Sequence, residues 1–479
     1  LRLLAFLLLL HSLALAQQNS HPNIVVILTD QWRGQALGFL GKEKVFTPNL
    51  DALSNEGLVL TQMVANYPVC SAARAMIFSG TYPVKNKVHA NANSKSAPFG
   101  VELPTDMVCW SDVLKQQGYS NGYIGKWHLD APYRPFIPTA NNKEDLAWNE
   151  WTPPHRRHGF DYWYAYNTYD FHSRPMYWDT KAQRDSFHYV DQWGPEHEAD
   201  KAIDFFNNKG NVRNPNEPFS LVVSINPPHE PYNTAPAQYH EPYKNIPIDD
   251  LLTDADIPPA GTPMGNEYRR DIKNYYASIT GVDAQIGRII RALKDAKLFD
   301  NTIILVTADH GNCLGKHGEH SKNNIYEASL RIPFIICWQG KIKAGIDSSF
   351  LGSLPDIYPT LLDLAGLKKQ IPGTIDGISY ADYFVGRSKR RPSEQFFMGA
   401  IAYDPAEYGR SGFRGIRNAD YKLAFQKKAG ETMAYLFDLR NDPFELQNIY
   451  RADHPQVKLL KPRLEMLLKN YKDDFSVDD

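Results

Sequence analysis

Four apolar runs, three of them rich in β-branched residues, are each followed closely by polar residues that can carry chemistry. Such continuous runs are typical of strands buried on both faces, as in parallel sheets covered by helices. The carboxyl ends of parallel strands share one edge, where ligands of open α/β sheets bind. The runs and their polar residues are 24–29 with Asp30, 119–124 with Lys126 and His128, 219–225 with His229, and 302–308 with Asp309 and His310.

Helical patterns fall between these runs, at residues 111–117, 196–206, 271–296 and 355–365. Strands that alternate with helices predict an α/β fold, in which helices cover both faces of the sheet. We therefore expect a large, mostly parallel central sheet sandwiched by helices.

The chain divides into two units at a charged, proline-ended stretch, residues 386–392. We predict a catalytic domain over residues 17–385 and a C-terminal α+β subdomain over 386–479. Residues 421–425 and 434–438 are typical of short strands, and residues 457–470 predict an amphipathic closing helix.

Residues 1–16 carry one arginine and an apolar run, and they end in Ala14-Leu15-Ala16. This pattern predicts a secretory signal peptide, because the run is too short to span a membrane comfortably. No later stretch is typical of a transmembrane helix, so we expect no stable membrane insertion. The sequence lacks Asn-x-Ser/Thr acceptor sites, which favours an exported bacterial protein, periplasmic or secreted, over an animal glycoprotein.

Charge and cysteine content exclude two further classes of protein. A formal net charge of -2 argues against a nucleic-acid partner, which requires a basic face. Four cysteines in a chain of this length do not make a disulfide scaffold.

Cys70 opens a predicted short helix, and Arg74 follows it by four residues. Residues i and i+4 share one helix face, so both side chains can meet an anion near the helix N-terminus, where the macrodipole favours negative charge. A lone cysteine is more often a small buried side chain. The polar residues at the strand ends favour a functional role instead.

The predicted strand edge combines cations with candidate metal ligands. Hard oxygen ligands and a neutral amide suit Ca²⁺ or Mg²⁺ better than zinc, and an imidazole also tolerates Mn²⁺. Three cations and a divalent metal would outweigh the two carboxylates, so we expect a positive surplus and an oxyanion substrate. The expected ligands at this point are Asp30, Gln31, Asp309 and His310, to which the family resemblance given below adds Cys70, and the cations are Arg74, Lys126 and Lys322.

The chain resembles the type I sulfatases of the alkaline phosphatase superfamily over nearly its whole length. This resemblance implies an alkaline phosphatase-like fold, with a smaller antiparallel C-terminal sheet packed on the first unit. The motifs that carry it are residues 22–30, the Cys70 to Arg74 signature, Gly125-Lys126-Trp127-His128-Leu129, Pro228-His229-Glu230-Pro231-Tyr232, Asp309-His310-Gly311, Lys322 before Tyr326-Glu327, Arg331-Ile332-Pro333, and the tail motifs 413–417, 435–439 and 441–443.

In this family the signature cysteine becomes formylglycine, so the resemblance implies that a maturation enzyme converts Cys70 to an aldehyde. One hydroxyl of the aldehyde hydrate, bound to the metal, would attack sulfur, and His128 would deprotonate the second to expel sulfate. His229 would protonate the leaving alcohol. The resemblance assigns the sulfate oxygens to Arg74, Lys126 and Lys322.

Three positions differ from the pattern common in the family. Ala72 replaces a frequent proline, which leaves open whether an oxygen-dependent or an anaerobic radical enzyme acts on Cys70. Gln31 replaces an aspartate, and His310 replaces an asparagine. Asp-Gln with Asp-His-Gly also occurs in choline-sulfatase-like and phosphonate monoester hydrolase-like relatives. Phosphonate monoester or phosphodiester hydrolysis is therefore the alternative activity.

Residues 131–193 hold five of the nine tryptophans and show little periodicity, which predicts long ordered loops over the site. Aromatic, arginine and histidine side chains suit a sulfated sugar, and His172 and Arg174 are candidate substrate contacts. We expect a sulfatase that acts on a sulfated carbohydrate. An unconverted Cys70 would instead point to a non-catalytic glycan-binding protein.

Overall fold

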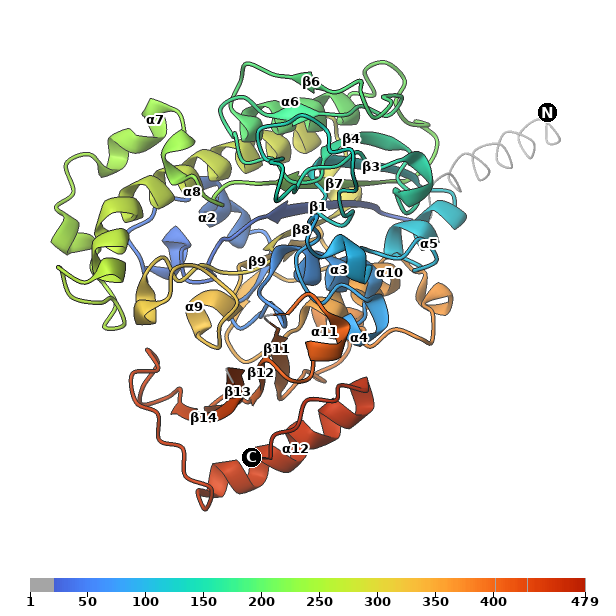
Figure 1. The fold of residues 1–479 in the computed structure, drawn as a ribbon. Helices are drawn as coiled ribbons and strands as arrows, with labels where there is room; N and C mark the ends of the chain where they lie inside the picture. The colour runs from blue at the N-terminus through green and yellow to red at the C-terminus, as the bar shows by residue number, and fades with distance from the viewer. Residues whose placement is uncertain (1–20, 401, 429, 479) are drawn as a thin grey trace, which may run out of the picture.

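The computed structural model describes residues 21–400, 402–428 and 430–478. The expected signal peptide, residues 1–16, lies outside them. Within the described chain, eight strands form a central sheet in the order β10-β2-β9-β8-β1-β7-β3-β4 (Figure 1). The strands are β1 (Asn23–Thr29), β2 (Leu58–Leu60), β3 (Ser120–Lys126), β4 (Tyr162–Tyr166), β7 (Phe219–Ile225), β8 (Thr302–Ala308), β9 (Phe334–Cys337) and β10 (Gly345–Asp347).

The sheet is parallel from β8 through β1, β7 and β3 to β4. Strand β9 runs antiparallel to β8 and β2, so the sheet is mixed at one side. Every residue of β1, β3, β7 and β8 is buried, as expected for strands between two helical layers. The predicted α/β class is confirmed, although β3 continues to Lys126, beyond the predicted end at residue 124.

Two groups of helices cover the sheet (Figure 1). Helices α2 and α6 both contact α8, and α3, α5 and α10 form the second contacting group. The longer helices are α2 (Pro48–Ser54), α3 (Cys70–Ser79), α5 (Trp110–Gln116), α6 (Gly194–Phe206), α8 (Pro263–Asp295) and α10 (Ile357–Leu364), and the one-turn helices are α4 (Pro83–Asn86), α7 (Ala237–His240), α9 (Glu327–Leu330) and α11 (Ala381–Phe384).

Helix α8 begins eight residues before the predicted start at residue 271. The Thr262 side chain accepts a hydrogen bond from the Gly265 amide, and Pro263 occupies the first helical position. Both are helix-start signals. The first turns are polar on most faces, so the apolar periodicity alone places the start too late.

The C-terminal sheet lies against the unit that carries the central sheet (Figure 1). Phe397, Phe413 and Phe437 pack in one cluster with Val64 and Leu330 of that unit. The small sheet is antiparallel in the order β11-β12-β13-β14. Its elements are β11 (Gln395–Gly399), β12 (Gly412–Arg417), β13 (Tyr421–Lys428), β14 (Glu431–Asp438) and the closing helix α12 (Pro455–Tyr471), and a separate hairpin pairs β5 (Met176–Tyr177) with β6 (His188–Tyr189).

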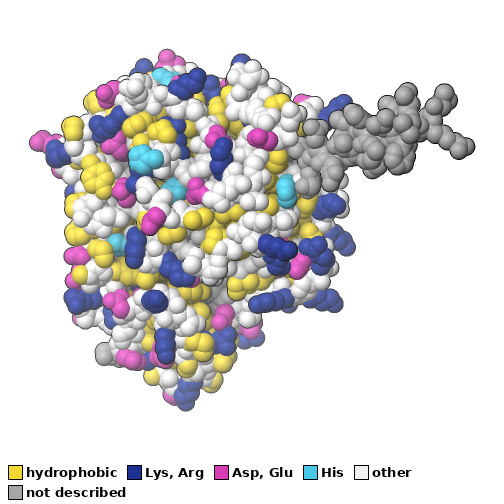
Figure 2. All heavy atoms as spheres, turned by 90° about the vertical axis from the view of Figure 1, so that its right-hand side faces the viewer, with side chains coloured by type: hydrophobic (Ala, Val, Ile, Leu, Met, Phe, Trp, Pro, Cys, Tyr) yellow, Lys and Arg dark blue, Asp and Glu magenta, His cyan; other side chains and the backbone are white. Residues whose placement is uncertain are grey.

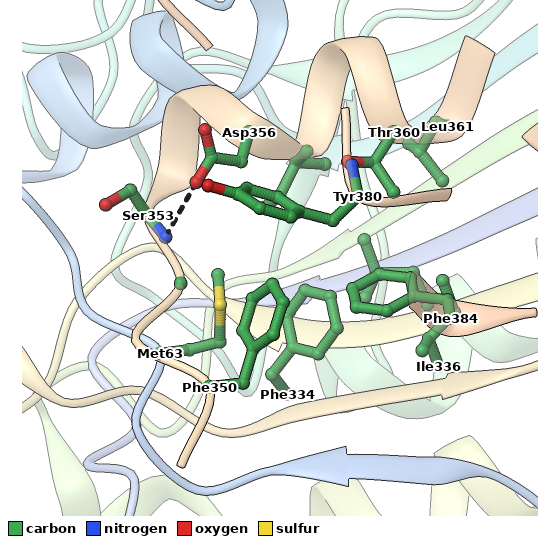
Figure 3. A pocket seen from close by; sticks show the side chains of 13 residues that line it. Met63, Phe334, Ile336, Phe350, Ser353, Asp356, Thr360, Leu361, Tyr380 and Phe384 are labelled. Carbon is green, nitrogen blue, oxygen red and sulfur yellow. Dashed lines mark hydrogen bonds between the residues drawn. The ribbon is translucent and has the colours of Figure 1, made fainter. Parts of the chain in front are cut away.

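An apolar cavity near α10 is too small to be a ligand site (Figure 3). It encloses about 20 Å³, which is room for roughly one water molecule. The partly buried Asp356 carboxylate at its edge accepts hydrogen bonds from the backbone amides of Ser353 (3.3 Å) and Ile378 (2.8 Å). The Asp356 carboxylate stabilises a backbone turn through these two bonds. The cavity is a small void left by side-chain packing.

The surface carries charges of both signs, in keeping with the small net charge. On the face drawn in Figure 2, basic and acidic side chains are interspersed. None of the described helices is long and apolar enough to cross a membrane.

Glu198 of α6 is a buried acid close to the central sheet. Its carboxylate accepts hydrogen bonds from the hydroxyls of Tyr177 (3.2 Å) and Tyr166 (3.4 Å). Burial raises the pKa of Glu198 to about 8, from an ordinary value of 4.5. Between about pH 4.5 and pH 8, Glu198 therefore stays protonated in the folded chain but is ionised in the unfolded chain. The free energy of unfolding falls as pH rises through this range.

We expect Glu198→Gln to remove this pH-dependent loss, because glutamine resembles the neutral acid. Urea unfolding should show that the variant gains about 2–3 kcal/mol over the wild type on moving from about pH 5.5 to about pH 8.5. Glu196→Gln, on the same helix but partly exposed, is the control. An equal stability difference at both pH values would contradict the assignment.

Candidate active site

Two aspartates meet where neighbouring strands β1 and β8 end. The Asp309 amide donates to Thr29 O (3.1 Å), and the Asp30 amide donates to Ile225 O of β7 (3.1 Å). Each strand ladder thus continues one residue beyond the strands and holds the aspartates at one level. The predicted convergence at the carboxyl edge of the sheet is present.

Arg74 of α3 lies between the two carboxylates and is fully buried. Its Nε contacts Asp309 Oδ2 (3.0 Å), and its Nη2 contacts Asp30 Oδ2 (3.3 Å). Its Nη1 donates to Lys126 O and Ser224 Oγ, both at 2.8 Å. In this geometry the carboxylates and the backbone engage its guanidinium, and the expected contact of Arg74 with sulfate oxygens stays a prediction.

Cys70 is the first residue of α3 and is 2% exposed. Its Sγ lies 3.1 Å from Lys322 Nζ, 3.2 Å from His310 Nε2 and 3.7 Å from Asp30 Oδ1. Burial opposes ionisation, but the nearby lysines and His310 outweigh it and hold the pKa of the Cys70 thiol well below its ordinary value. The Cys70 side chain therefore faces the lysines of the site, which favour negative charge at its position.

The four predicted ligands Asp30, Cys70, Asp309 and His310 form one group, with ligand atoms within 4.8 Å of one another. The fifth, Gln31, lies beside them: its backbone N–H donates to Asp309 Oδ1 (3.2 Å), and its side-chain Oε1 accepts from Lys322 Nζ (2.9 Å). Carboxylate, amide and imidazole donors fit a divalent cation such as Ca²⁺, Mg²⁺ or Mn²⁺. The metal prediction is therefore supported in its donor chemistry.

The neighbouring carboxylates of Asp30 and Asp309 repel each other, and positive charge between them would stabilise both. Burial and the neighbouring Asp30 raise the pKa of Asp309 to about 6. Burial would raise the pKa of Asp30 as well, but Lys126, with Nζ 2.6 Å from Asp30 Oδ2, helps to hold it well below its ordinary value. A cation between these oxygens would relieve their repulsion.

A cleft of about 490 Å³ opens above this group. Lys126 lies at its base, where its Nζ also donates to Asn226 Oδ1 (3.1 Å). Lys322 reaches the cleft from a loop before α9, whereas the nearby Lys316 pairs with Asp254 in a buried network. The cleft is lined by Cys70, Asn91, Lys126, His128, Trp148, Thr168, Asp170, His229, Glu230, Pro231 and Lys322.

His229 lines the cleft as a cationic imidazole. Its Nδ1 bonds to Glu230 O (2.8 Å) and lies 3.7 Å from Asp170 Oδ1, which leaves Nε2 for a ligand. Burial would lower the pKa of His229, but the Glu230 carboxylate outweighs it, and the pKa rises to about 9. The ring is protonated at neutral pH and can supply a proton.

His128 lines the same cleft as a neutral imidazole. Burial lowers the pKa of His128, and neither ring nitrogen has a hydrogen-bond partner among the described residues. Its backbone lies in the left-handed region, with φ of 56°. A strained, unpartnered and neutral imidazole in a polar cleft can accept a proton from a bound molecule.

The two candidate substrate contacts are not in the cleft. The His172 ring is buried, and its Nε2 lies 3.1 Å from His229 O and 3.3 Å from Glu230 O, so it supports their loop. Arg174 is largely exposed and pairs with Asp191 (2.9 Å). The aromatic loop pattern that suggested both residues does not specify the direction of a side chain.

Asp170 and Glu230 were missed as site residues, and they reduce the expected positive surplus. Glu230 accepts from Gln31 Nε2 (2.5 Å), and Asp170 accepts from Asn226 Nδ2 (3.1 Å). Glu230 directly follows His229 in a motif that was recognised, so it carried a usable signal. Asp170 comes from a loop whose path follows no local pattern.

Comparisons with known proteins identify the family. Residues 22–367 match the sulfatase family, and residues 315–474 match the family described as N-sulphoglucosamine sulphohydrolase, C-terminal. The chain belongs to the sulfatase family, and it hydrolyses sulfate esters. The predicted fold, family and enzyme class are confirmed.

Relatives match over most of their length. An endo-4-O-sulfatase from Bacteroides thetaiotaomicron is 35% identical and covers 92% of this chain and 90% of its own sequence. An ulvan-active sulfatase from Formosa agariphila is 30% identical over 93% of this chain and 80% of its own. The solved structure of yidJ from Bacteroides fragilis has a TM-score of 0.90 at 46% identity, covering 95% of this chain and 97% of its own.

The alternative activity is not favoured. The phosphonate monoester hydrolase of Agrobacterium radiobacter has a TM-score of 0.67 at 23% identity, covering 95% of this chain and 96% of its own. That likeness shows the fold alone. The endo-4-O-sulfatase and the ulvan-active sulfatase, by contrast, match at 30% identity or more over most of the chain.

We expect a divalent cation to stabilise the folded protein. After dialysis against EDTA, Ca²⁺ at about a hundred times its Kd should add about 2.7 kcal/mol and raise the melting temperature. Asp309→Asn should reduce this gain, whereas Asp300→Asn, which changes an exposed acid, should retain it. Melting temperatures that do not respond to Ca²⁺, Mg²⁺ or Mn²⁺ would contradict a metal site.

Proposed function

We propose that this sulfatase removes sulfate from a sulfated carbohydrate, with Cys70 converted to formylglycine as the nucleophile. The observation that carries the proposal is the position of Cys70 Sγ, within 3.2 Å of both Lys322 Nζ and His310 Nε2 at the strand edge. Formylglycine would supply a nucleophilic hydroxyl at this point, in a site that already favours negative charge.

Asp30, Gln31, Asp309 and His310 would hold the cation, for which Ca²⁺ is the first choice and Mg²⁺ or Mn²⁺ is possible by donor type. When bound, it would polarise a sulfate oxygen and offset the paired carboxylates. Arg74 positions the two carboxylates through its fork of hydrogen bonds.

Lys126 and Lys322 are the cations that line the cleft beside Cys70. Both would hold sulfate oxygens and stabilise the charge that builds up in the transition state. Nearby acids raise the pKa of each ammonium group, so both remain charged despite burial. This fixed positive charge costs little reorganisation when the substrate reacts.

Two histidines with opposite protonation states divide the proton transfers. His229, protonated through Glu230, donates from Nε2 to the leaving alcohol. His128, kept neutral by burial, accepts the proton whose removal releases sulfate. Different environments for two titratable groups are a common arrangement for acid and base roles.

A carbohydrate substrate is supported by the relatives and by the cleft. The relatives include an endo-4-O-sulfatase, an ulvan-active sulfatase and an N-acetylglucosamine-6-O-sulfatase. Trp148, Thr168 and Asn91 line the cleft and offer an aromatic ring, a hydroxyl and an amide to a sugar.

We further propose export to the bacterial periplasm or the exterior, which the pattern in residues 1–16 supports. Conversion of Cys70 requires a maturation enzyme, either the oxygen-dependent or the anaerobic type. Ala72, two residues after Cys70, is the position that bears on this choice.

Cys70 is expected to be modified in active enzyme. Mass spectrometry of the peptide that contains Cys70, from protein made in its own host, should detect the aldehyde or its hydrate. Cys70→Ala should lose turnover yet keep its folded circular dichroism spectrum, whereas Cys313→Ala, at another buried cysteine, should stay active. Full activity from protein with an intact Cys70 thiol would refute the nucleophile.

His229→Ala should slow the hydrolysis of an unactivated sugar sulfate by about 10²–10⁴-fold, because the leaving alcohol then lacks its proton donor. The loss should be smaller with 4-nitrophenyl sulfate, whose phenolate leaves readily. In the wild type, kcat should fall as pH rises through about 9, when His229 loses its proton.

His155→Ala, an exposed histidine outside the cleft, is the matched control and should leave both rates unchanged. An equal loss with both leaving groups would remove the acid role from His229 and leave it a purely structural one.

A further inference from the structure

A second cavity lies next to the catalytic cleft and shares none of the residues that line it. It has a volume of about 350 Å³, within the range of small-ligand sites. Tyr133 and Trp151 give it aromatic surface, and Arg156 and Arg184 give it donors. The catalytic roles described above use none of these side chains.

Two separate segments join the cavities. His128 lines the catalytic cleft and Asp130 lines the second cavity, while Trp148 and Glu150 do the same on another stretch. Residues two apart span at most about 7 Å of extended chain. The second cavity therefore lies about one or two sugar units from the catalytic cleft, within reach of a carbohydrate chain bound there.

Arginines and acidic side chains of the second cavity form ion pairs with one another. Arg184 Nε and Nη2 pair with the two oxygens of Glu150, both at 2.8 Å. Arg156 pairs with Asp130 through Nε and with Glu102 through Nη2 (3.3 Å). A third guanidinium, that of Arg134, donates to Glu144 O (2.6 Å) and has no ion pair among the described residues. The three arginines and the three acids that line the cavity balance in charge, so an anion gains little there.

The same pairs leave donors for a neutral ligand. A guanidinium has five N–H donors, and the bonds of Arg156 and Arg184 to described residues use Nε and Nη2. The Nη1 atoms of Arg156 and Arg184 are not among the buried atoms that lack a hydrogen-bond partner in the described chain. Solvent can therefore reach both atoms. Their fixed N–H groups can donate to hydroxyl oxygens.

The aromatic side chains supply the second element of sugar recognition. The Tyr133 side chain is 50% exposed and lines the cavity. The apolar face of a sugar can pack on an exposed aromatic ring. The ion-paired carboxylates can also accept hydrogen bonds from sugar hydroxyls. The charges of the cavity balance, its arginine N–H donors are held in place, and its tyrosine ring is exposed. These properties fit an uncharged sugar unit better than a sulfate group.

We infer that this cavity is a second carbohydrate subsite, which binds an unsulfated sugar unit of the chain whose sulfate ester lies in the catalytic cleft. This inference rests on the proposed function. It implies that the enzyme prefers oligosaccharides long enough to fill both cavities over a single sulfated sugar.

The test compares short and long substrates. Di- and hexasaccharides of sulfated galactans, in which the units between the sulfated sugars carry no charge, are screened for sulfate release, and kcat/KM is measured for each pair that reacts. Tyr133→Ala removes the exposed ring, and Arg184→Gln removes the free guanidinium donors. Phe46→Ala and Arg387→Gln, exposed residues outside both cavities, are the controls.

In the wild type, kcat/KM should be higher for the hexasaccharide. Each cavity variant should lower it about tenfold for the hexasaccharide, the equivalent of about 1.4 kcal/mol, and leave the disaccharide within about twofold. The inference is overturned if the wild type shows no length preference, if the variants keep it, or if they lose activity equally on both lengths.

Absence of sulfate release from every glycan would overturn the proposed function instead. The subsite is then decided by titrating the desulfated hexasaccharides in a calorimeter. Binding that Tyr133→Ala and Arg184→Gln weaken about tenfold, while the controls retain it, supports the subsite. No binding, or binding that the cavity variants leave unchanged, overturns it.

Discussion

The Asp30 and Asp309 carboxylates lie side by side in a buried site, and the arrangement of the active site follows from their repulsion. Isolated buried charges are costly, so cations must accompany them. Arg74 bridges the two from α3, and Lys126 meets Asp30 from β3. These contacts join three parallel strands to the helix that carries Cys70. The same charges create the place for a divalent cation.

The C-terminal sheet contributes to the site without reaching the cleft. Lys422 of β13 donates to Ile325 O (2.6 Å) and pairs with Glu327 (3.2 Å), a few residues after Lys322. The amide of Asn323, next to Lys322, donates to Pro68 O (3.1 Å), close to Cys70. These contacts help to hold the loop that brings Lys322 to Cys70.

The sheet and its polar edge were predictable because strand burial and strand ends are local properties. Continuous β-branched runs identified β1, β7 and β8, and the polar residues that follow them meet as expected. The antiparallel β9 could not be predicted in the same way, because strand direction depends on the path of the connecting chain. Arg74 was assigned to the correct helix face, yet its guanidinium turned to the carboxylates, which are the strongest nearby partners.

The sequence by itself determined the family, the α/β fold and the residues that carry chemistry at the strand ends, since these depend on residue type and short spacing. Tertiary structure alone decided that Asp170 joins the cleft and that Arg174 does not. It also placed a second, neutral cavity beside the first. The physical reason is that loop paths, and so the directions of their side chains, are set by long-range packing and charge pairing that no local pattern records.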